Sequence, residues 1–229
     1  MKKIVKKNKF NYLILFTIAS FLCLTRFIDN DLLWHIKNGE FILANGFVPK
    51  QDYFSYFDNL YFMSHSWLFD IVLYRVFNSL GLLGLKIIST IITFLTLSVV
   101  YKGMNYKKQR PILNIILLLI FVPMLTFFFE PRPQIITFLL LSVIAFITML
   151  IQKDEKHIKL IYFFPIITLI TSNIDGGTLL QYFVFLLLLI LTNSFSEFIK
   201  KINNPTEKMN LNVVKHLTLS MIIGFITSL

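Results

Sequence analysis

Residues 29–67, which read DNDLLWHIKNGEFILANGFVPKQDYFSYFDNLYFMSHSW, form the only long segment of the chain that is too polar to lie inside a bilayer. The segment holds five acidic side chains, two lysines and two of the four histidines. The rest of the sequence is mostly uncharged apolar runs joined by short basic connectors. This pattern predicts a polar site carried on a membrane scaffold.

The composition of the whole chain is that of a multi-pass membrane protein. Of its 229 residues, 56% are hydrophobic and only 15% are charged, whereas about 25% are charged in a soluble domain. The net charge of +10 comes largely from lysines at the ends of apolar runs. Because membrane topology accounts for basic residues in those places, we expect no nucleic-acid partner. The single cysteine, Cys23, excludes an intrachain disulfide.

The basic residues predict the orientation of the chain. Five lysines precede the first apolar run, residues 10–28, whose length is close to the roughly 20 residues needed to cross a bilayer. A cleaved signal peptide has the same basic-then-apolar pattern, but no small-residue cleavage site follows here. We predict a retained first span in a bacterial plasma membrane, with the N-terminus in the cytoplasm and residues 29–81 outside.

The outer segment is predicted to begin with a helix that lies on the membrane surface. An Asp/Asn N-cap at residues 29–31 starts this helix, and its side chains fall into two stripes at helical spacing. One stripe is apolar (Leu32, Ile36, Gly39 and Leu43), and the other is polar (Asp31, His35 and Asn38). A helix with these two sides lies along the surface, with its polar side facing away from the lipid.

A second surface helix is predicted over residues 66–81. It carries Asp70 and Arg75, whose charges are costly in lipid, and it is short for a span. We expect these two side chains to pair with each other or with water. Further spans are predicted at residues 82–101, 111–129, 135–151, 160–172, 178–195 and 212–229, the last one incomplete. The predicted fold is an all-α polytopic transmembrane bundle whose first extracytoplasmic loop contains juxtamembrane helices.

Under this topology three polar clusters emerge on the outer face. They are Asp29 with Asp31, the EPRPQ turn at residues 130–134, and the NIDGG turn at residues 173–177. The connectors at residues 102–110, 153–159 and 197–208 each have a basic excess and fall inside.

Several of these motifs occur in the same order in a known group of proteins. They are DNDLLWHIKNGEFIL (29–43), GFVP (46–49), DYFSY (52–56), HSWLFDIVLYRVF (65–77), RPQ (132–134) and NIDGG (173–177). Over residues 29–180 the chain thereby resembles bacterial multi-pass proteins described as glycosyltransferase-like, within the GT-C class of membrane glycosyltransferases. The group reads W-x-N-x-H-G where this chain reads TSNIDG at residues 171–176.

The resemblance implies a transferase that takes a sugar from a polyprenyl-phosphate donor. The acceptor would be a glycan, a lipid or a protein at the outer face, and membrane lipids would surround the enzyme. In such a transfer a carboxylate takes the proton of the acceptor hydroxyl, and cationic groups stabilise the departing phosphate. The resemblance implies Asp31 as the catalytic base, with Asp29 as its rival. Either residue can equally be the helix N-cap.

Five further residues are expected to bind the donor or its phosphate: Arg132, Gln134, His35, His65 and Asn173. Arg132 offers paired donors to phosphate, although without the resemblance a role as a topological flank paired with Glu130 is simpler. His35 has the alternative of facing water, and Asn173 that of belonging to an ordinary turn. His65 has the alternative of anchoring the second surface helix at the interface.

No metal site is predicted. Asp29, Asp31, His35 and His65 are metal-ligating residue types, but their spacing specifies no known site. Whether a divalent metal assists the reaction stays open.

Two other functions are alternatives to the enzyme. A non-catalytic or truncated relative would act as a membrane scaffold or binding protein. A transporter or lipid flippase usually has ionisable residues at the midplane and paired repeats, and no central apolar run here has a charge in its middle.

Overall fold

The computed structural model describes residues 2–24, 30–54, 61, 63–107, 110–121, 130–204 and 209–228. Over these residues the chain is all-α, as predicted, with one isolated antiparallel bridge between Gln51 and Tyr61 and no strand. The helices are α1 (Lys2–Leu24), α2 (Asn30–Asn45), α3 (Trp67–Lys107), α4 (Pro111–Phe121), α5 (Gln134–Lys153), α6 (Phe163–Ile174), α7 (Leu179–Asn203) and α8 (Asn212–Ser228). Two 3₁₀ segments, η2 (Glu155–Tyr162) and η3 (Gly176–Thr178), flank α6.

Four helical segments are long and apolar enough to cross a membrane. They cover residues 67–106, 134–152, 155–174 and 176–203, and they make the chain a membrane protein by length and composition. Large apolar side chains on their outer surfaces, such as Leu187, Leu188 and Leu191, are exposed, as expected of helices that face lipid. The described apolar parts of α1 and α4 are shorter, at residues 10–24 and 111–120.

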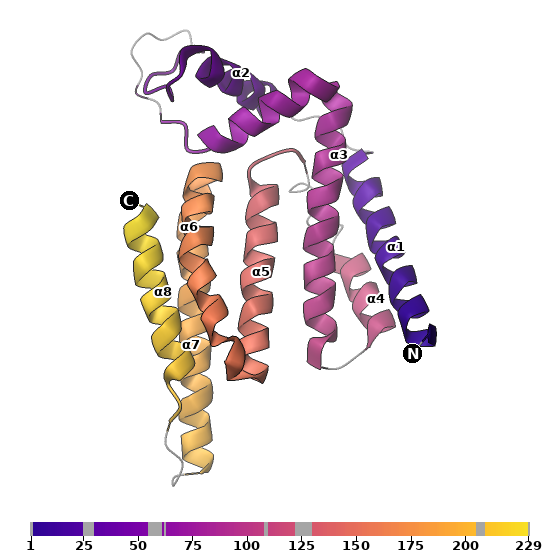
Figure 1. Ribbon diagram of the computed structural model, residues 1–229, viewed down its shortest axis with the longest axis vertical. Helices are drawn as coiled ribbons and strands as arrows, with labels where there is room; N and C mark the ends of the chain where they lie inside the picture. The colour runs from indigo at the N-terminus through magenta and orange to yellow at the C-terminus, as the bar shows by residue number, and fades with distance from the viewer. Residues whose placement is uncertain are drawn as a thin grey trace.

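The helices are arranged as an upright bundle with a cover at one end (Figure 1). The second half of α3 and helices α1, α4, α5, α6, α7 and α8 run along the long axis, whereas α2 and the first half of α3 lie across the upper end. The turn before α5 and the turn between α6 and α7 also lie at the upper end. The start of α1 and the C-terminal ends of α3, α5 and α7 lie at the lower end.

A single glycine produces the bend between the two halves of α3. Gly81 has φ 62° and ψ −158°, a backbone conformation that is essentially restricted to glycine. The helical hydrogen-bonding pattern continues on both sides of it, so the chain turns from the cover into the upright bundle at this residue. The sequence predicts the end of the second surface helix at this same residue.

Three apolar cores hold the elements together. The first joins α1, α3 and α4 around Leu15, Leu97 and Leu118, and the second joins α5, η2, α6, α7 and α8 around Ile144, Phe164 and Tyr182. The third lies where α2 packs against α3, and its buried members are Leu32, Ile36, Phe69, Leu73 and Leu85. Ile136 of α5 and Ile174 of α6 pack against this third core. The cover is thereby seated on the upper ends of α5 and α6.

The two helices of the cover cross at Gly39. A Cβ atom placed on Gly39 would lie 2.1 Å from the backbone oxygen of Asp70 and 2.9 Å from Cβ of Tyr74. Real Cβ atoms do not approach backbone this closely, so any side chain at residue 39 would push α2 away from α3. The glycine allows the backbones of the two helices to meet.

We predict that Gly39→Ala destabilises the protein by about 2 kcal/mol, because overpacking of a close contact usually costs 1–3 kcal/mol. Gly103→Ala is the matched control, since its added Cβ would meet the nearest atom, Sδ of Met149, at an ordinary 3.5 Å. Thermal unfolding in detergent measures both variants. Equal melting temperatures for Gly39→Ala and Gly103→Ala would contradict the close crossing.

Candidate functional site

The polar stripe of α2 faces α3 and is largely buried. His35 has 9% of its surface exposed and Asn38 none, and Leu32 and Ile36 of the predicted apolar stripe are buried as well. The alternative in which His35 faces water is therefore wrong, and Asn38 is buried as well. The physical reason is that α3 provides hydrogen-bonding partners for this side, and paired polar groups can be buried at little cost.

Those partners converge on Asp70, whose carboxylate is completely buried. Oδ1 of Asp70 lies 2.6 Å from Nδ1 of His35 and accepts a hydrogen bond from the Ser66 hydroxyl at 3.2 Å. Oδ2 accepts from Nδ2 of Asn38 at 2.5 Å and from the Ser64 hydroxyl at 3.2 Å. Both carboxylate oxygens thus have two partners each. The expected pairing of Asp70 with Arg75 is wrong, because α2 and the segment before α3 satisfy the carboxylate instead.

Asp31 lies at the exposed end of the same stripe, in the first turn of α2. Its Oδ2 is 3.2 Å from Nη2 of Arg132, in the turn before α5, and Nε of Arg132 is 3.8 Å from Oε2 of Glu130. The side chain of Asp31 is 65% exposed and that of Arg132 33% exposed. A carboxylate and a guanidinium from distant parts of the sequence therefore meet where water and a solute can reach them.

The third predicted cluster lies against the start of α3. Oδ1 of Asn173 accepts a hydrogen bond from Nε1 of Trp67 at 3.1 Å, and the backbone N–H of Gly176 donates to the carbonyl oxygen of His65 at 2.8 Å. The His65 side chain is exposed beside this turn. A Cβ on Gly176 would lie 3.2 Å from the carbonyl oxygen of His65 and 3.3 Å from its Cβ, so this glycine allows the turn to pack closely against His65.

Asp175 and Gln134 lie deeper at the same end. Asp175 is 2% exposed, and its Oδ2 accepts a hydrogen bond from the Thr137 hydroxyl of α5 at 2.9 Å. Thr137 is also 3.2 Å from the hydroxyl of Thr178. Oε1 of Gln134 is buried and has no hydrogen-bond partner within the described part of the chain. The 173–177 turn is thus fixed to α5 by a buried carboxylate.

The predicted site residues fall into two groups. The first group lies in α2 and at the start of α5 and consists of Asp31, His35, Arg132 and Gln134. The second group lies at the junction of α3 with α6 and consists of His65 and Asn173. Asp29 lies outside the described residues. Within the described ranges, no group of three or more His, Cys, Asp or Glu side chains is placed to hold a metal ion.

The outer surface of α2 carries one further ion pair. Nζ of Lys37 donates to Oε2 of Glu40 at 2.6 Å, and this hydrogen bond raises the pKa of Lys37 above its ordinary value. Both side chains are substantially exposed, so the pair contributes little to stability.

No protein-family model, curated protein sequence or solved structure matches this chain.

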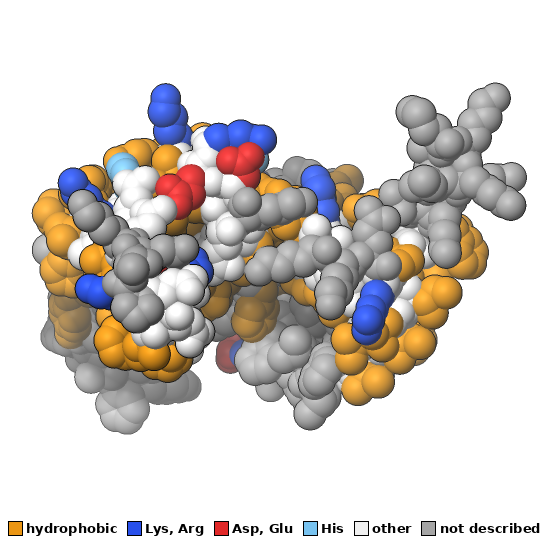
Figure 2. Space-filling view, turned by 90° about the horizontal axis from the view of Figure 1, so that it is seen from below, with side chains coloured by type: hydrophobic (Ala, Val, Ile, Leu, Met, Phe, Trp, Pro, Cys, Tyr) orange, Lys and Arg blue, Asp and Glu red, His pale blue; other side chains and the backbone are white. Residues whose placement is uncertain are grey.

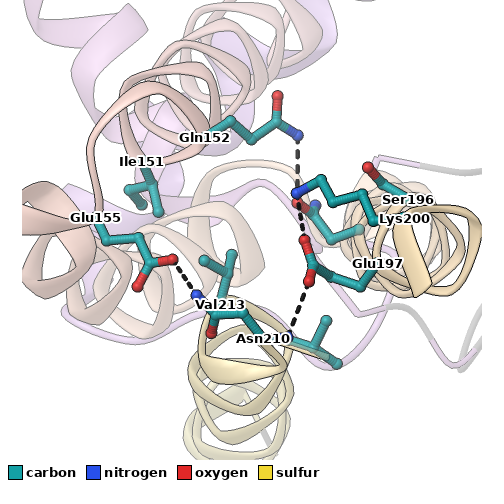
Figure 3. A pocket seen from close by; sticks show the side chains of 10 residues that line it. Ile151, Gln152, Glu155, Ser196, Glu197, Lys200, Asn210 and Val213 are labelled. Atoms are coloured by element: carbon teal, nitrogen blue, oxygen red, sulfur yellow. Dashed lines mark hydrogen bonds and ion pairs between the residues drawn. The ribbon is translucent and has the colours of Figure 1, made fainter. Parts of the chain in front are cut away.

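A second polar cluster surrounds a pocket of about 230 Å³ at the lower end, between α5, η2, α7 and α8 (Figure 3). Asn210 connects its walls: Nδ2 donates to Glu155 at 2.5 Å, and the backbone N–H donates to Glu197 at 2.9 Å. Lys200 pairs with the other oxygen of Glu197 at 2.5 Å. Because these groups satisfy one another and lie at the end opposite to Asp31 and Arg132, we assign the cluster to the packing of α8 rather than to the candidate site.

Sequence reasoning placed the relevant residues at this end of the molecule but missed the buried network of Asp70 with Ser64 and Ser66. It also missed the burial of Asp175 against Thr137. One signal for Asp70 was present, because it shares a helical face with Phe69 and Leu73, which are buried core residues. A carboxylate on the apolar face of a helix must have buried partners. The identity of those partners depends on which helix crosses there.

We predict that Asp70→Ala destabilises the protein by about 3–5 kcal/mol, because it removes one partner of a buried pair and leaves the others unsatisfied. Asp31→Ala is expected to cost about 1 kcal/mol or less, since its ion pair is largely exposed. Thermal unfolding of both variants in the same detergent gives the comparison. Equal destabilisation by the two substitutions would contradict the difference in burial.

Proposed function

We propose that this chain is a membrane glycosyltransferase-like protein that transfers a sugar from a polyprenyl-phosphate donor to an acceptor at the outer face of a bacterial plasma membrane. The observation that carries the proposal is the ion pair between Asp31 and Arg132. These are a proton acceptor and a phosphate-binding cation, the two kinds of group that such a transfer needs.

The distribution of charge supports the orientation. Within the described residues, the basic segments 102–107, 153–159 and 197–204 share the lower end with the start of α1. Figure 2, which views this end, has Lys and Arg side chains around its rim with fewer acidic ones between them. Basic connectors remain in the cytoplasm. Asp31 and Arg132 would then be on the outer side, where an acceptor arrives.

The exposure of the pair supports access by both substrates. The polyprenyl tail would lie in the bilayer beside the exposed apolar surfaces of the helices, and its phosphate would reach the headgroup level. Arg132 would exchange its contact with Asp31 for one with the phosphate oxygens. Asp31, which is 65% exposed, would then be free to accept a hydrogen bond from the acceptor hydroxyl.

In the transfer, the acceptor oxygen attacks the anomeric carbon as Asp31 takes its proton. The bond from the anomeric carbon to the phosphate oxygen breaks, and its electron pair leaves with the phosphate, whose negative charge Arg132 stabilises. Gln134 and His35, near the same pair, are proposed to line the donor side. His65 and Asn173 are proposed to do so from the α3–α6 junction.

The test is sugar transfer by the purified protein in liposomes with a panel of labelled polyprenyl-phosphate sugars and membrane acceptors. Asp31→Asn is expected to lower the rate about 10²–10⁴-fold, the usual contribution of a general base. Arg132→Gln is expected to lower it as well, because the phosphate loses its cation, and Arg132→Lys is expected to retain part of the activity.

Asp154→Asn is the matched control. Asp154 is also a partly exposed carboxylate paired with a cation, Lys156 at 2.6 Å, but it lies at the lower end. The transfer rate of the Asp154→Asn variant should equal that of the wild type. Asp29→Asn, measured beside Asp31→Asn, separates the base from its rival. If no donor is turned over by the wild type, the enzymatic proposal fails and a scaffold or binding role takes its place.

A further inference from the structure

The buried pair of His35 and Asp70 has the geometry of an oriented base. Nδ1 of His35 lies 2.6 Å from Oδ1 of Asp70, and Asp70 is fully buried while 11% of the His35 side chain is exposed. The rings of Trp34 and Phe69 pack edge-on against the imidazole. The imidazole is therefore held in one orientation by a carboxylate on one side and by aromatic rings around it.

The other donors to Asp70 fix the tautomer of this imidazole. Asn38 and Ser64 donate to Oδ2, and Ser66 donates to Oδ1, so the carboxylate acts as an acceptor at both oxygens. Nδ1 of His35 must then carry the hydrogen that it shares with Asp70. In the neutral imidazole this leaves the lone pair on Nε2, which has no hydrogen-bond partner among the residues that the structure describes.

The position of His35 relates this nitrogen to the proposed site. His35 lies one helical turn after Asp31 on α2, and residues four apart on a helix have Cβ atoms about 5–6 Å apart. The charged groups around the imidazole are Asp70 from α3 and Asp31 from α2, the latter paired with Arg132 from the turn before α5. One exposed carboxylate and one oriented imidazole thus follow each other along the same stripe.

We propose that His35 is the final proton acceptor of this site and that Asp70 is the residue that positions it. The proposal rests on the proposed sugar transfer. The hydroxyl proton of the acceptor passes to Asp31 as the acceptor oxygen bonds to the anomeric carbon, and then to Nε2 of His35, directly or through one water. The phosphate departs with the electron pair of the broken carbon–oxygen bond.

The charges favour this destination for the proton. A proton that stays on Asp31 removes the negative charge that pairs with Arg132. A proton on Nε2 of His35 turns the His35–Asp70 hydrogen bond into a buried ion pair and returns Asp31 to its ionised form. Asp31 can then pair with Arg132 again once the phosphate has left. His35 releases the proton to water through its exposed edge, and the neutral imidazole is ready for the next cycle. The same arrangement of a carboxylate behind an imidazole recurs in enzymes that move protons through histidine.

The first test is the tautomer of His35, measured by nuclear magnetic resonance on protein labelled with ¹⁵N at histidine. The signals of the four histidines are assigned by single His→Gln variants. We expect neutral His35 to carry its hydrogen on Nδ1, and we expect Asp70→Asn to redistribute it between the two nitrogens. A hydrogen on Nε2 in the wild type, or a tautomer that Asp70→Asn leaves unchanged, would overturn the assignment.

The second test is the transfer reaction with His35→Gln, which keeps an N–H donor for Asp70 but cannot take a proton. We expect kcat to fall about a hundredfold with KM nearly unchanged. His157→Gln, at the lower end, is the control and should match the wild type.

The two tests separate this inference from the function it rests on. If the wild type transfers sugar and His35→Gln is equally fast, the proton acceptor is elsewhere and the inference fails while the function stands. If the wild type transfers no sugar, the proposed function and the proton-acceptor role of His35 both fail. The tautomer measurement still reports whether Asp70 orients His35.

Discussion

The buried carboxylate of Asp70 is the constraint on which the upper end of the molecule depends. A carboxylate in a protein interior is very costly unless donors surround it. The donors to Asp70 among the described residues come from α2 and from the residues just before α3. Satisfying Asp70 therefore requires α2 to lie against α3 in one register. Gly39 permits that contact by allowing the two backbones to meet, and the apolar core around Leu32 and Phe69 adds the burial that stabilises it.

This register determines where the exposed charges lie. With His35 and Asn38 turned toward α3, Asp31 one turn earlier emerges at the rim of the cover, next to Arg132. The cover is in turn seated on α5 and α6 through Ile136 and Ile174, and through the bonds of Trp67 with Asn173 and of His65 with Gly176. The buried polar network and the exposed ion pair are thus parts of one structure. The buried network fixes the position of α2, and the exposed ion pair places the Asp31 carboxylate at the surface of the bundle.

The sequence predicts the all-α fold and points to Gly81, because apolar run lengths and glycine backbone freedom are local properties. Counting spans predicts that Asp31 and Arg132 lie on the same side, since an even number of crossings returns the chain there. Their ion pair is known only from the structure. The environment of His35 does not follow. A helical stripe of Asp, His and Asn has the same spacing whether it faces water or a second helix, and only the crossing at Gly39 decides between them. Asp175 is similar. A polar turn such as Asn-Ile-Asp-Gly is expected to be exposed, whereas the carboxylate of Asp175 is buried and accepts a hydrogen bond from Thr137 of α5.

Cross-linking of residues 31 and 132 tests most directly whether these segments meet on the outer face. Asp31→Cys and Arg132→Cys are combined in a Cys23→Ala background, and intact cells are treated with a short bifunctional thiol reagent that cannot cross the membrane. We expect an intramolecular cross-link for this pair of cysteines. We expect none for Asp31→Cys combined with Asp154→Cys at the lower end. No cross-link between residues 31 and 132, or one that forms only after the cells are made permeable, would contradict it.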